Sequence, residues 1–306
     1  MVFAYHEMGY ACFEALLGLG APVAALFTHP DDPAEAVWWR SCVELARRHG
    51  VPVHLSDGPL DGELVARVAS LKPEVIYSFY YRALLSDLVL KSATIAALNL
   101  HGSLLPAYRG RAPVNWVLVN GERRTGVTLH HMVAKADAGD IVAQCETEIS
   151  DDDTAFTLYG RLVAMGAAIV RQWHPRIVAG DAPRIPQDHA RATYFGRRRP
   201  EDGRIQWTWP ARRIFNLVRA VSHPYPGAFC FAQERKMFVW RARIGQESER
   251  RGEPGAIIGT VGAQGLEVAA GEGSVVLESV QPQGGEEIAA GLLGQQEFLR
   301  NVVKLA

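Results

Sequence analysis

The first half of the chain alternates short apolar runs with helical patterns, and this alternation constrains the fold more than any other feature. Three apolar runs of strand length are Val2–Tyr5, Val23–Phe27 and Val75–Phe79. Apolar residues at intervals of three to four predict helices over residues 10–19, 41–49 and 63–71. Strands that alternate with helices form a parallel sheet covered on both faces, which binds ligands beyond the carboxyl ends of its strands. The chain is therefore predicted to begin with a doubly wound, mostly parallel, Rossmann-like α/β sheet.

The turn after the first predicted strand argues against a dinucleotide site. It spans His6–Tyr10 and contains one glycine, whereas a G-x-G-x-x-G turn needs three. Without them the backbone cannot approach a pyrophosphate closely, so we predict that no NAD binds there.

The pattern changes beyond residue 180. A long helix is predicted over residues 154–173, with Pro175 kinking or ending it, and residues 180–203 are rich in Pro, Arg and Asp. A helix at residues 214–221 then precedes five short strand-like runs separated by turn residues, a pattern typical of a small OB-like β-barrel. The predicted organisation is a Rossmann-like catalytic domain (1–190), a linker (191–204) and a smaller OB-like domain (205–306).

The charge balance limits the classes of partner. Lys and Arg number 32 against 33 Asp and Glu, and a net charge of −1 argues against a protein that coats nucleic acid or a membrane. No apolar run reaches the length of a membrane span or of a signal peptide, so we expect a cytoplasmic protein. The four cysteines lack metal-ligand spacing and are predicted to be free thiols, and we predict no metal site.

Polar side chains gather at the end of a predicted strand at residues 96–101. Asn99 and His101 share one face of this strand because side chains alternate along it. An amide can donate to a developing oxyanion, and an imidazole can move protons near neutral pH. The two residues therefore form a plausible acyl-transfer pair, although they could instead only cap backbone groups.

The loops that follow carry further charged groups. Arg109 and Arg111 lie in a proline-containing loop and can bind carboxylate or phosphate. Asp137 and Asp140 follow the next predicted strand and could orient a histidine, bind a cation or lie in a solvated turn. The neighbouring His130–His131 pair is predicted to point to opposite faces of that strand, which excludes chelation by both.

These segments together resemble a known family. Asn99–Pro106, Tyr108–Gly110, Thr125–Thr128 and Asp137–Asp140 are similar to motifs of the formyltransferases that use 10-formyltetrahydrofolate. Within that family the similarity to the ArnA-type UDP-4-amino-4-deoxy-L-arabinose formyltransferases extends over nearly the whole chain. The further matching segments are Phe3–His6, Ser78–Arg82, Arg111–Glu122, Phe195–Arg198, Arg219–Val221 and Pro224–Phe229.

The resemblance implies a catalytic set made of Asn99, His101 and Asp137. The neutral amine of the acceptor would attack the formyl carbon carried by folate N10, and Asn99 would donate to the resulting oxyanion. His101 would donate to the same oxygen or carry the proton from the amine to the leaving nitrogen. Asp137 would orient His101 and help to accept the amine proton through water.

The resemblance also implies binding residues. The segments that match the family's folate contacts contain Ala83, Leu84, Leu85, Arg111, Val133, Ala134, Lys135, Ala136 and Asp137. For the acceptor, charge and closeness to the catalytic strand make Tyr108, Arg111 and Asn115 candidates. The co-substrate would be 10-formyltetrahydrofolate, and the acceptor a nucleotide-linked aminosugar, as in lipid A modification and polymyxin resistance.

Three alternatives stay open. Methionyl-tRNA formyltransferases share these motifs, but a tRNA partner favours a basic surface, which the composition does not indicate. The acceptor could instead be a dTDP- or GDP-linked aminosugar, because no motif identifies the base-binding residues. A non-catalytic ligand-binding module with this fold is the third alternative, and the sequence leaves the oligomeric state open.

Overall fold

The computed structural model describes residues 1–306 except 34, 250, 263–264 and 296–302. The chain divides into two compact units, each described separately below. The first unit contains Met1–Pro113, Arg124–Glu148 and Tyr159–Gly196, and the second contains Val114–Arg123, Ile149–Leu158 and Arg197–Ala306. The second unit thus includes two short segments that lie between parts of the first unit in the sequence. The domain boundaries expected at residues 190 and 204 stay a prediction.

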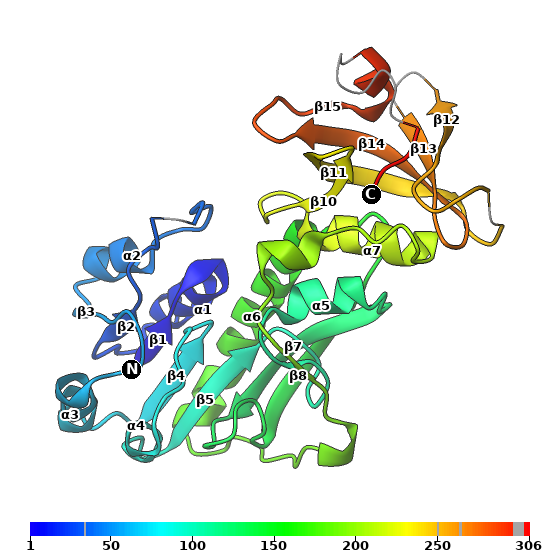
Figure 1. The fold of residues 1–306 in the computed structure, drawn as a ribbon. Helices are drawn as coiled ribbons and strands as arrows, with labels where there is room; N and C mark the ends of the chain where they lie inside the picture. The colour runs from blue at the N-terminus through cyan, green and yellow to red at the C-terminus, as the bar shows by residue number, and fades with distance from the viewer. Residues whose placement is uncertain (34, 250, 263–264, 296–302) are drawn as a thin grey trace. The chain divides into compact units, whose positions relative to one another are not determined.

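A seven-stranded sheet forms the centre of the first unit (Figure 1). Its strands are β1 (Val2–Ala4), β2 (Leu26–Thr28), β3 (Val53–Leu55), β4 (Val75–Phe79), β5 (Ala96–His101), β7 (Arg124–His131) and β8 (Ile141–Glu148). The order is β3-β2-β1-β4-β5-β7-β8, and all neighbours are parallel except the antiparallel pairs β5–β7 and β7–β8. The predicted doubly wound, mostly parallel α/β sheet is confirmed.

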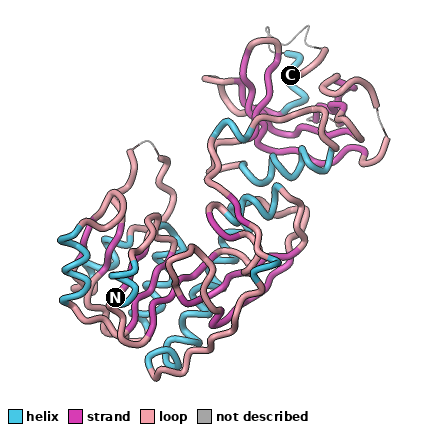
Figure 2. Tube along the Cα trace, turned by 60° about the horizontal axis from the view of Figure 1, so that its bottom comes forward, coloured by secondary structure: helices cyan, strands magenta, loops and turns pink. Residues whose placement is uncertain are grey.

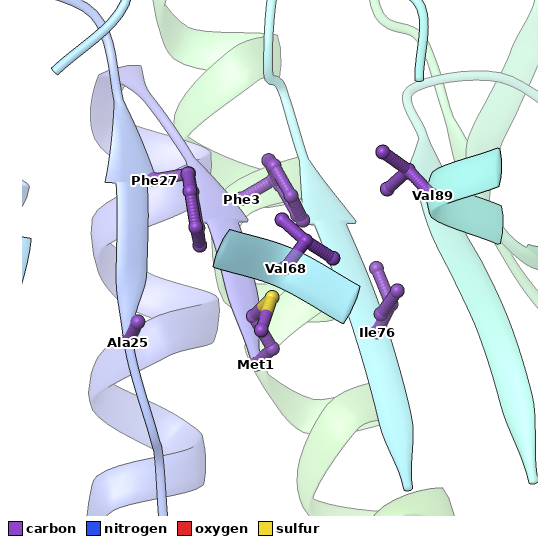
Figure 3. Packing of buried hydrophobic residues seen from close by; sticks show 7 residues of the cluster. All are labelled: Met1, Phe3, Ala25, Phe27, Val68, Ile76 and Val89. Carbon is purple, nitrogen blue, oxygen red and sulfur yellow. The ribbon is translucent and has the colours of Figure 1, made fainter. Parts of the chain in front are cut away.

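Helices cover both faces of this sheet. They are α1 (His6–Gly18), α2 (Cys42–Arg48), α3 (Gly62–Ser70), α4 (Asp87–Lys91) and, in part, α6 (Ala155–Val178). On one face, Val68 of α3 and Val89 of α4 join Phe3, Phe27 and Ile76 in a buried cluster (Figure 3). On the other face α6 approaches α1 and β5 so closely that a Cβ at Gly166 would lie 2.6 Å from Met8 Sδ. Of the two outcomes predicted at Pro175, a kink or an end of the helix, the second is wrong, because α6 continues to Val178 with the proline inside it.

Two short strands, β6 (Arg109–Gly110) and β9 (Tyr194–Phe195), pair in parallel in the first unit. They join the loop after β5 to the last segment of the unit, which also contains the 3₁₀ helix His189–Arg191. This pairing brings residues about 85 positions apart in the sequence next to the end of β5.

The second unit contains mostly antiparallel strands, and α7 (Ala211–Val221) is its longest complete helix in the described residues. Strands and loops make up most of this unit, which carries the C-terminus (Figure 2). Its strands are β10 (Ala228–Ala232), β11 (Arg235–Gln246), β12 (Ile257–Val261), β13 (Gly265–Ala269), β14 (Ser274–Pro282) and β15 (Ile288–Ala289). Backbone bonds from Val303, Leu305 and Ala306 link β10 to residues 255–257, which joins the two edges of the sheet. The smaller antiparallel β domain is confirmed.

No helix in the described ranges is both long and apolar enough to cross a membrane.

The four cysteines are free thiols. Three of them, Cys12, Cys42 and Cys230, are buried, and Cys145 is half-buried. Burial raises the pKa of the Cys42 and Cys230 thiols to about 12.

Candidate functional site

The carboxyl end of β5 carries the first two predicted site residues. Leu98 and Leu100 point into the core, and Asn99 and His101 point to the opposite face, as the alternation of side chains predicts. β5 lies between the parallel strand β4, where Ser78 is opposite Asn99, and the antiparallel strand β7. Asn99 and His101 therefore project where the sheet changes from parallel to antiparallel pairing.

The loop after β7 brings Asp137 to the same place. Asp137 has a left-handed backbone conformation, with φ at 53°. The Gly110 N–H donates to Asp137 Oδ2 at 2.9 Å, and Asp137 Oδ1 lies 3.6 Å from His101 Nδ1. His101 and Asp137 are far apart in the sequence. The β5–β7 pairing and the hydrogen bond from Gly110 of β6 bring them close together in space.

The hydrogen bonds of His101 identify the nitrogen that carries its proton. Nε2 lies 2.7 Å from the Tyr108 carbonyl oxygen, which can only accept, so Nε2–H is the donor. In the neutral ring Nδ1 is therefore unprotonated and directed toward Asp137 Oδ1. This tautomer leaves a basic nitrogen on the side of the carboxylate.

A second histidine, His130, belongs to the same cluster. It lies directly opposite Asn99 in the β5–β7 pairing and is only 1 % exposed. Its Nε2 lies 3.1 Å from Asn99 Nδ2 and 3.6 Å from Asp137 Oδ1. From the sequence, His130 was considered only as one of two adjacent histidines that cannot chelate a metal together, and its position beside Asn99 was not predicted. An alternating-face argument extended to the neighbouring strand could have found it, provided that the register was known.

Charge around Asp137 favours its ionised form. Burial by itself would raise the pKa of this carboxyl group, but His101, His130 and the Gly110 N–H together hold the pKa well below its usual range. Asp137 is thus a carboxylate at neutral pH, placed between two imidazoles.

A buried network of hydrogen bonds stabilises the loop that contains Asp137. Arg109 is 0 % exposed, and its guanidinium donates to Gln187 Oε1 and to the Tyr194 hydroxyl. The Gln187 amide group in turn donates to the carbonyl oxygens of Asp137 (2.9 Å) and Gly139 (2.6 Å). Arg109, predicted to bind an anion, instead supports this loop, and Gln187 was not identified from the sequence.

The predicted folate residues lie in two segments, one that follows β4 and one that follows β7. Ala83, Leu84 and Leu85 follow β4, and Leu84 is 70 % exposed. Arg111 is exposed and donates to the Arg82 carbonyl at 2.9 Å, which ties it to this segment. The second segment, Val133–Asp137, contains the exposed residues Val133, Ala134 and Lys135 and the half-buried residue Ala136. Its Lys135 ammonium lies over the Tyr194 ring.

The three acceptor candidates lie in different environments. The Tyr108 ring is buried and stacks on Phe195 at 4.7 Å. Asn115 lies in the second unit, where its buried side chain donates to the Ala220 carbonyl oxygen. Arg111 alone of the three is exposed. Its guanidinium is the candidate best placed to meet a ligand from solvent.

The site made of Asn99, His101, His130 and Asp137 combines an amide donor, an imidazole with a basic nitrogen and an ionised carboxylate. Such a set can stabilise an oxyanion and move a proton, which suits acyl transfer. The described residues include no group of three or more His, Cys, Asp or Glu side chains that could hold a metal ion.

Comparison with protein families gives two matches. The family model described as formyl transferase matches residues 18–172. A second model, described as formyl transferase, C-terminal domain, matches residues 198–296. The first match includes Asn99, His101, His130 and Asp137.

Several solved structures share the fold. An N-formyltransferase from Helicobacter canadensis, in complex with folinic acid and dTDP-3-aminofucose, is 18% identical, with a TM-score of 0.71 over 90% of this chain and 97% of its own. WlaRD, a sugar 3N-formyl transferase solved with dTDP and 5-N-formyl-THF, is 16% identical, with a TM-score of 0.67 over 90% and 95%. HypX from Aquifex aeolicus, in complex with tetrahydrofolic acid, is 19% identical, with a TM-score of 0.62 over 98% of this chain and 47% of its own. At these identities the likeness concerns the fold.

Proposed function

Because the chain belongs to the formyl transferase family, we propose that it moves the formyl group of 10-formyltetrahydrofolate to the amine of a nucleotide-linked aminosugar. The observation that supports the proposal is that Asn99 and His101 of β5, His130 of β7 and Asp137 of the following loop lie close together. Solved relatives with this fold hold folate derivatives, and one of them holds a dTDP-linked aminosugar.

The residues suit the two steps of this reaction. The neutral amine nitrogen attacks the formyl carbon, and the carbonyl electron pair moves to oxygen, where the Asn99 N–H donates to it. The tetrahedral centre then collapses, and the bond between carbon and folate N10 breaks. The products are the formamide and tetrahydrofolate.

The proton released by the amine must reach N10. His101 Nδ1 is unprotonated in the neutral tautomer and can take this proton and return it to the leaving nitrogen. Asp137 is ionised and stabilises the imidazolium that forms in between. The formyl group on N10 is already activated, so this scheme needs no cysteine or serine nucleophile.

For the donor, we propose that Ala83–Leu85, Arg111 and the Val133–Asp137 segment contact the folate. The second segment contains Asp137 itself, and Arg111 bonds to residue 82, next to the first segment. Backbone groups in loops can hydrogen-bond the edge of a pterin while apolar side chains cover its faces. Arg111, tied to Arg82, is also our candidate for a contact with the acceptor.

For the acceptor, we propose UDP-4-amino-4-deoxy-L-arabinose, with dTDP-linked aminosugars as the second candidate. The first rests on the sequence resemblance over nearly the whole chain, and the second on the ligands of the solved relatives. A tRNA acceptor is disfavoured by a net charge of −1, since a polyanion is bound by basic surfaces.

The test is a panel of acceptors with 10-formyltetrahydrofolate as the common donor. Mass spectrometry should find a formylated product with the UDP-linked sugar, and faster formation than with dTDP- or GDP-linked aminosugars. Formylated methionyl-tRNA in the absence of any formylated aminosugar would refute the proposed acceptor class. Folate and nucleotide binding without turnover of any acceptor would refute enzymatic activity.

A further inference from the structure

The protons on His130 are constrained by its two neighbours. Its Nδ1 lies 2.9 Å from the His131 carbonyl oxygen, which only accepts, so Nδ1 carries a proton. Its Nε2 lies 3.1 Å from Asn99 Nδ2, which only donates. When the ring is neutral, this proton leaves a lone pair on Nε2, which then accepts from the Asn99 amide nitrogen.

This bond determines which end of the Asn99 side chain faces His130. An amide can be turned by 180° with almost no change in shape, which would exchange its oxygen and nitrogen. If Asn99 were turned, its Oδ1 would face the lone pair of His130 Nε2, and the two acceptors would repel each other. His130 thus selects the orientation in which Nδ2 lies toward β7.

The selected orientation matters because an amide nitrogen has two hydrogens that diverge within its plane. One is donated to His130, and in the described part of the chain no hydrogen bond from the other is seen, so it can serve a ligand oxygen. We propose that His130 is a positioning residue, which holds Asn99 so that this second N–H is presented to the formyl oxygen. The catalytic role of His130 rests on the proposed function, whereas its hydrogen bond to Asn99 does not.

The surroundings hold the His130 ring firmly in place. It is 1 % exposed, and β7 places it in register with Asn99 through backbone pairing. The charged or titratable groups facing it are Asp137, whose Oδ1 is 3.6 Å from Nε2, and the neighbouring His101, which shares that carboxylate. A rigid acceptor lowers the cost of orienting Asn99 during the reaction.

The first experiment reads the proton positions directly. In the full-length protein labelled with ¹⁵N-histidine, long-range ¹H–¹⁵N correlation spectra distinguish the two neutral tautomers and the imidazolium. Signals are assigned by comparison with His130→Gln and His101→Gln. We expect His130 as the Nδ1–H tautomer and His101 with its proton on Nε2. A His130 ring that is doubly protonated, or protonated on Nε2 alone, would overturn the inference.

The second experiment measures single-turnover formyl transfer. His130→Leu removes the acceptor and should slow the chemical step at least tenfold, since loss of a whole oxyanion donor costs about 10²–10³-fold, while KM for both substrates changes little. His130→Gln offers Oε1 as an acceptor and should recover most of the rate. His131→Leu is the matched control, because its buried imidazole contacts Pro183 on the other face of β7, and should keep the wild-type rate.

A double variant separates positioning from general structural support. If His130 acts through Asn99, adding His130→Leu to Asn99→Ala should cause no further loss of rate. Losses that multiply would overturn the inference. Failure of the proposed function is a different result: the wild-type protein would formylate no acceptor, and the tautomer measurement would then decide the inference by itself.

Discussion

Gln187 gives the strictest test of how the site is supported. Its side chain accepts two hydrogen bonds from the buried Arg109 guanidinium and donates two to the carbonyl oxygens of Asp137 and Gly139. Gln187→Leu keeps the side chain at a similar size but removes all four bonds. The substitution leaves a buried charge and two buried carbonyls without these partners.

The magnitude follows from the number of groups left unsatisfied. A buried polar group that loses its partner costs roughly 1–3 kcal/mol, and more when it is charged. Partial relaxation and water entry reduce the sum, so we expect a loss of about 3–5 kcal/mol in the free energy of unfolding. The Asp137 loop should also shift, and a displacement of about 1 Å near reacting groups can lower kcat by about 10²-fold.

The assay is urea unfolding followed by circular dichroism, together with formyl transfer below the unfolding transition. Gln172→Leu, an exposed glutamine on α6, is the control and should change neither quantity. Gln187→Glu separates the two roles, since a carboxylate still accepts from Arg109 but repels the two carbonyl oxygens. It should retain more stability than the leucine variant and still lose activity. A loss below about 1 kcal/mol for Gln187→Leu would refute the reasoning.

Further substitutions test other parts of the account. His101→Ala and Asp137→Ala should each reduce formyl transfer by about 10²–10⁴-fold with an unchanged circular dichroism spectrum, and wild-type rates would remove the residue from the mechanism. The folded pKa of Asp137 is depressed, so its ionisation stabilises the protein above the unfolded pKa of about 3.8 and ceases to do so as the pH falls. The stability difference between wild type and Asp137→Asn should therefore be constant from pH 5 to 8 and shrink below about pH 4, and a pH-independent difference would contradict this. Gly110→Ala places a Cβ 2.3 Å from the Phe195 carbonyl oxygen at a φ of 100°. It should lower the free energy of unfolding by at least about 2 kcal/mol, which thermal unfolding can measure. Cys145, the half-buried thiol, should react first with a thiol reagent in the native protein, as peptide mapping after a short pulse can show.

The fold of the first unit can be predicted well from the sequence, because the patterns that indicate its strands and helices lie within short stretches of the chain. Apolar runs and helical periods determine the parallel sheet, and the alternation along β5 correctly places Asn99 and His101 on one face. Their association with Asp137 could be inferred only from the family resemblance. Neither the period of a strand nor the composition of a loop shows which side chains meet across the sheet.

The residues that sequence reasoning missed depend on long-range pairing. His130 lies beside Asn99 because of the β5–β7 register, and Gln187 reaches Arg109 from 78 positions away. Asn115 shows how little closeness in the sequence says about contacts, since its closeness to β5 along the chain made it an acceptor candidate. Its side chain in fact bonds to the Ala220 carbonyl, 105 positions further along the chain.

The most direct measurement of the central claim is a single-turnover comparison of wild type and His101→Ala, with 10-formyltetrahydrofolate and UDP-4-amino-4-deoxy-L-arabinose. We expect stoichiometric transfer of the formyl group to the sugar amine by the wild-type protein, and at least about a hundredfold slower transfer by the variant. Equal rates for the two proteins would contradict it.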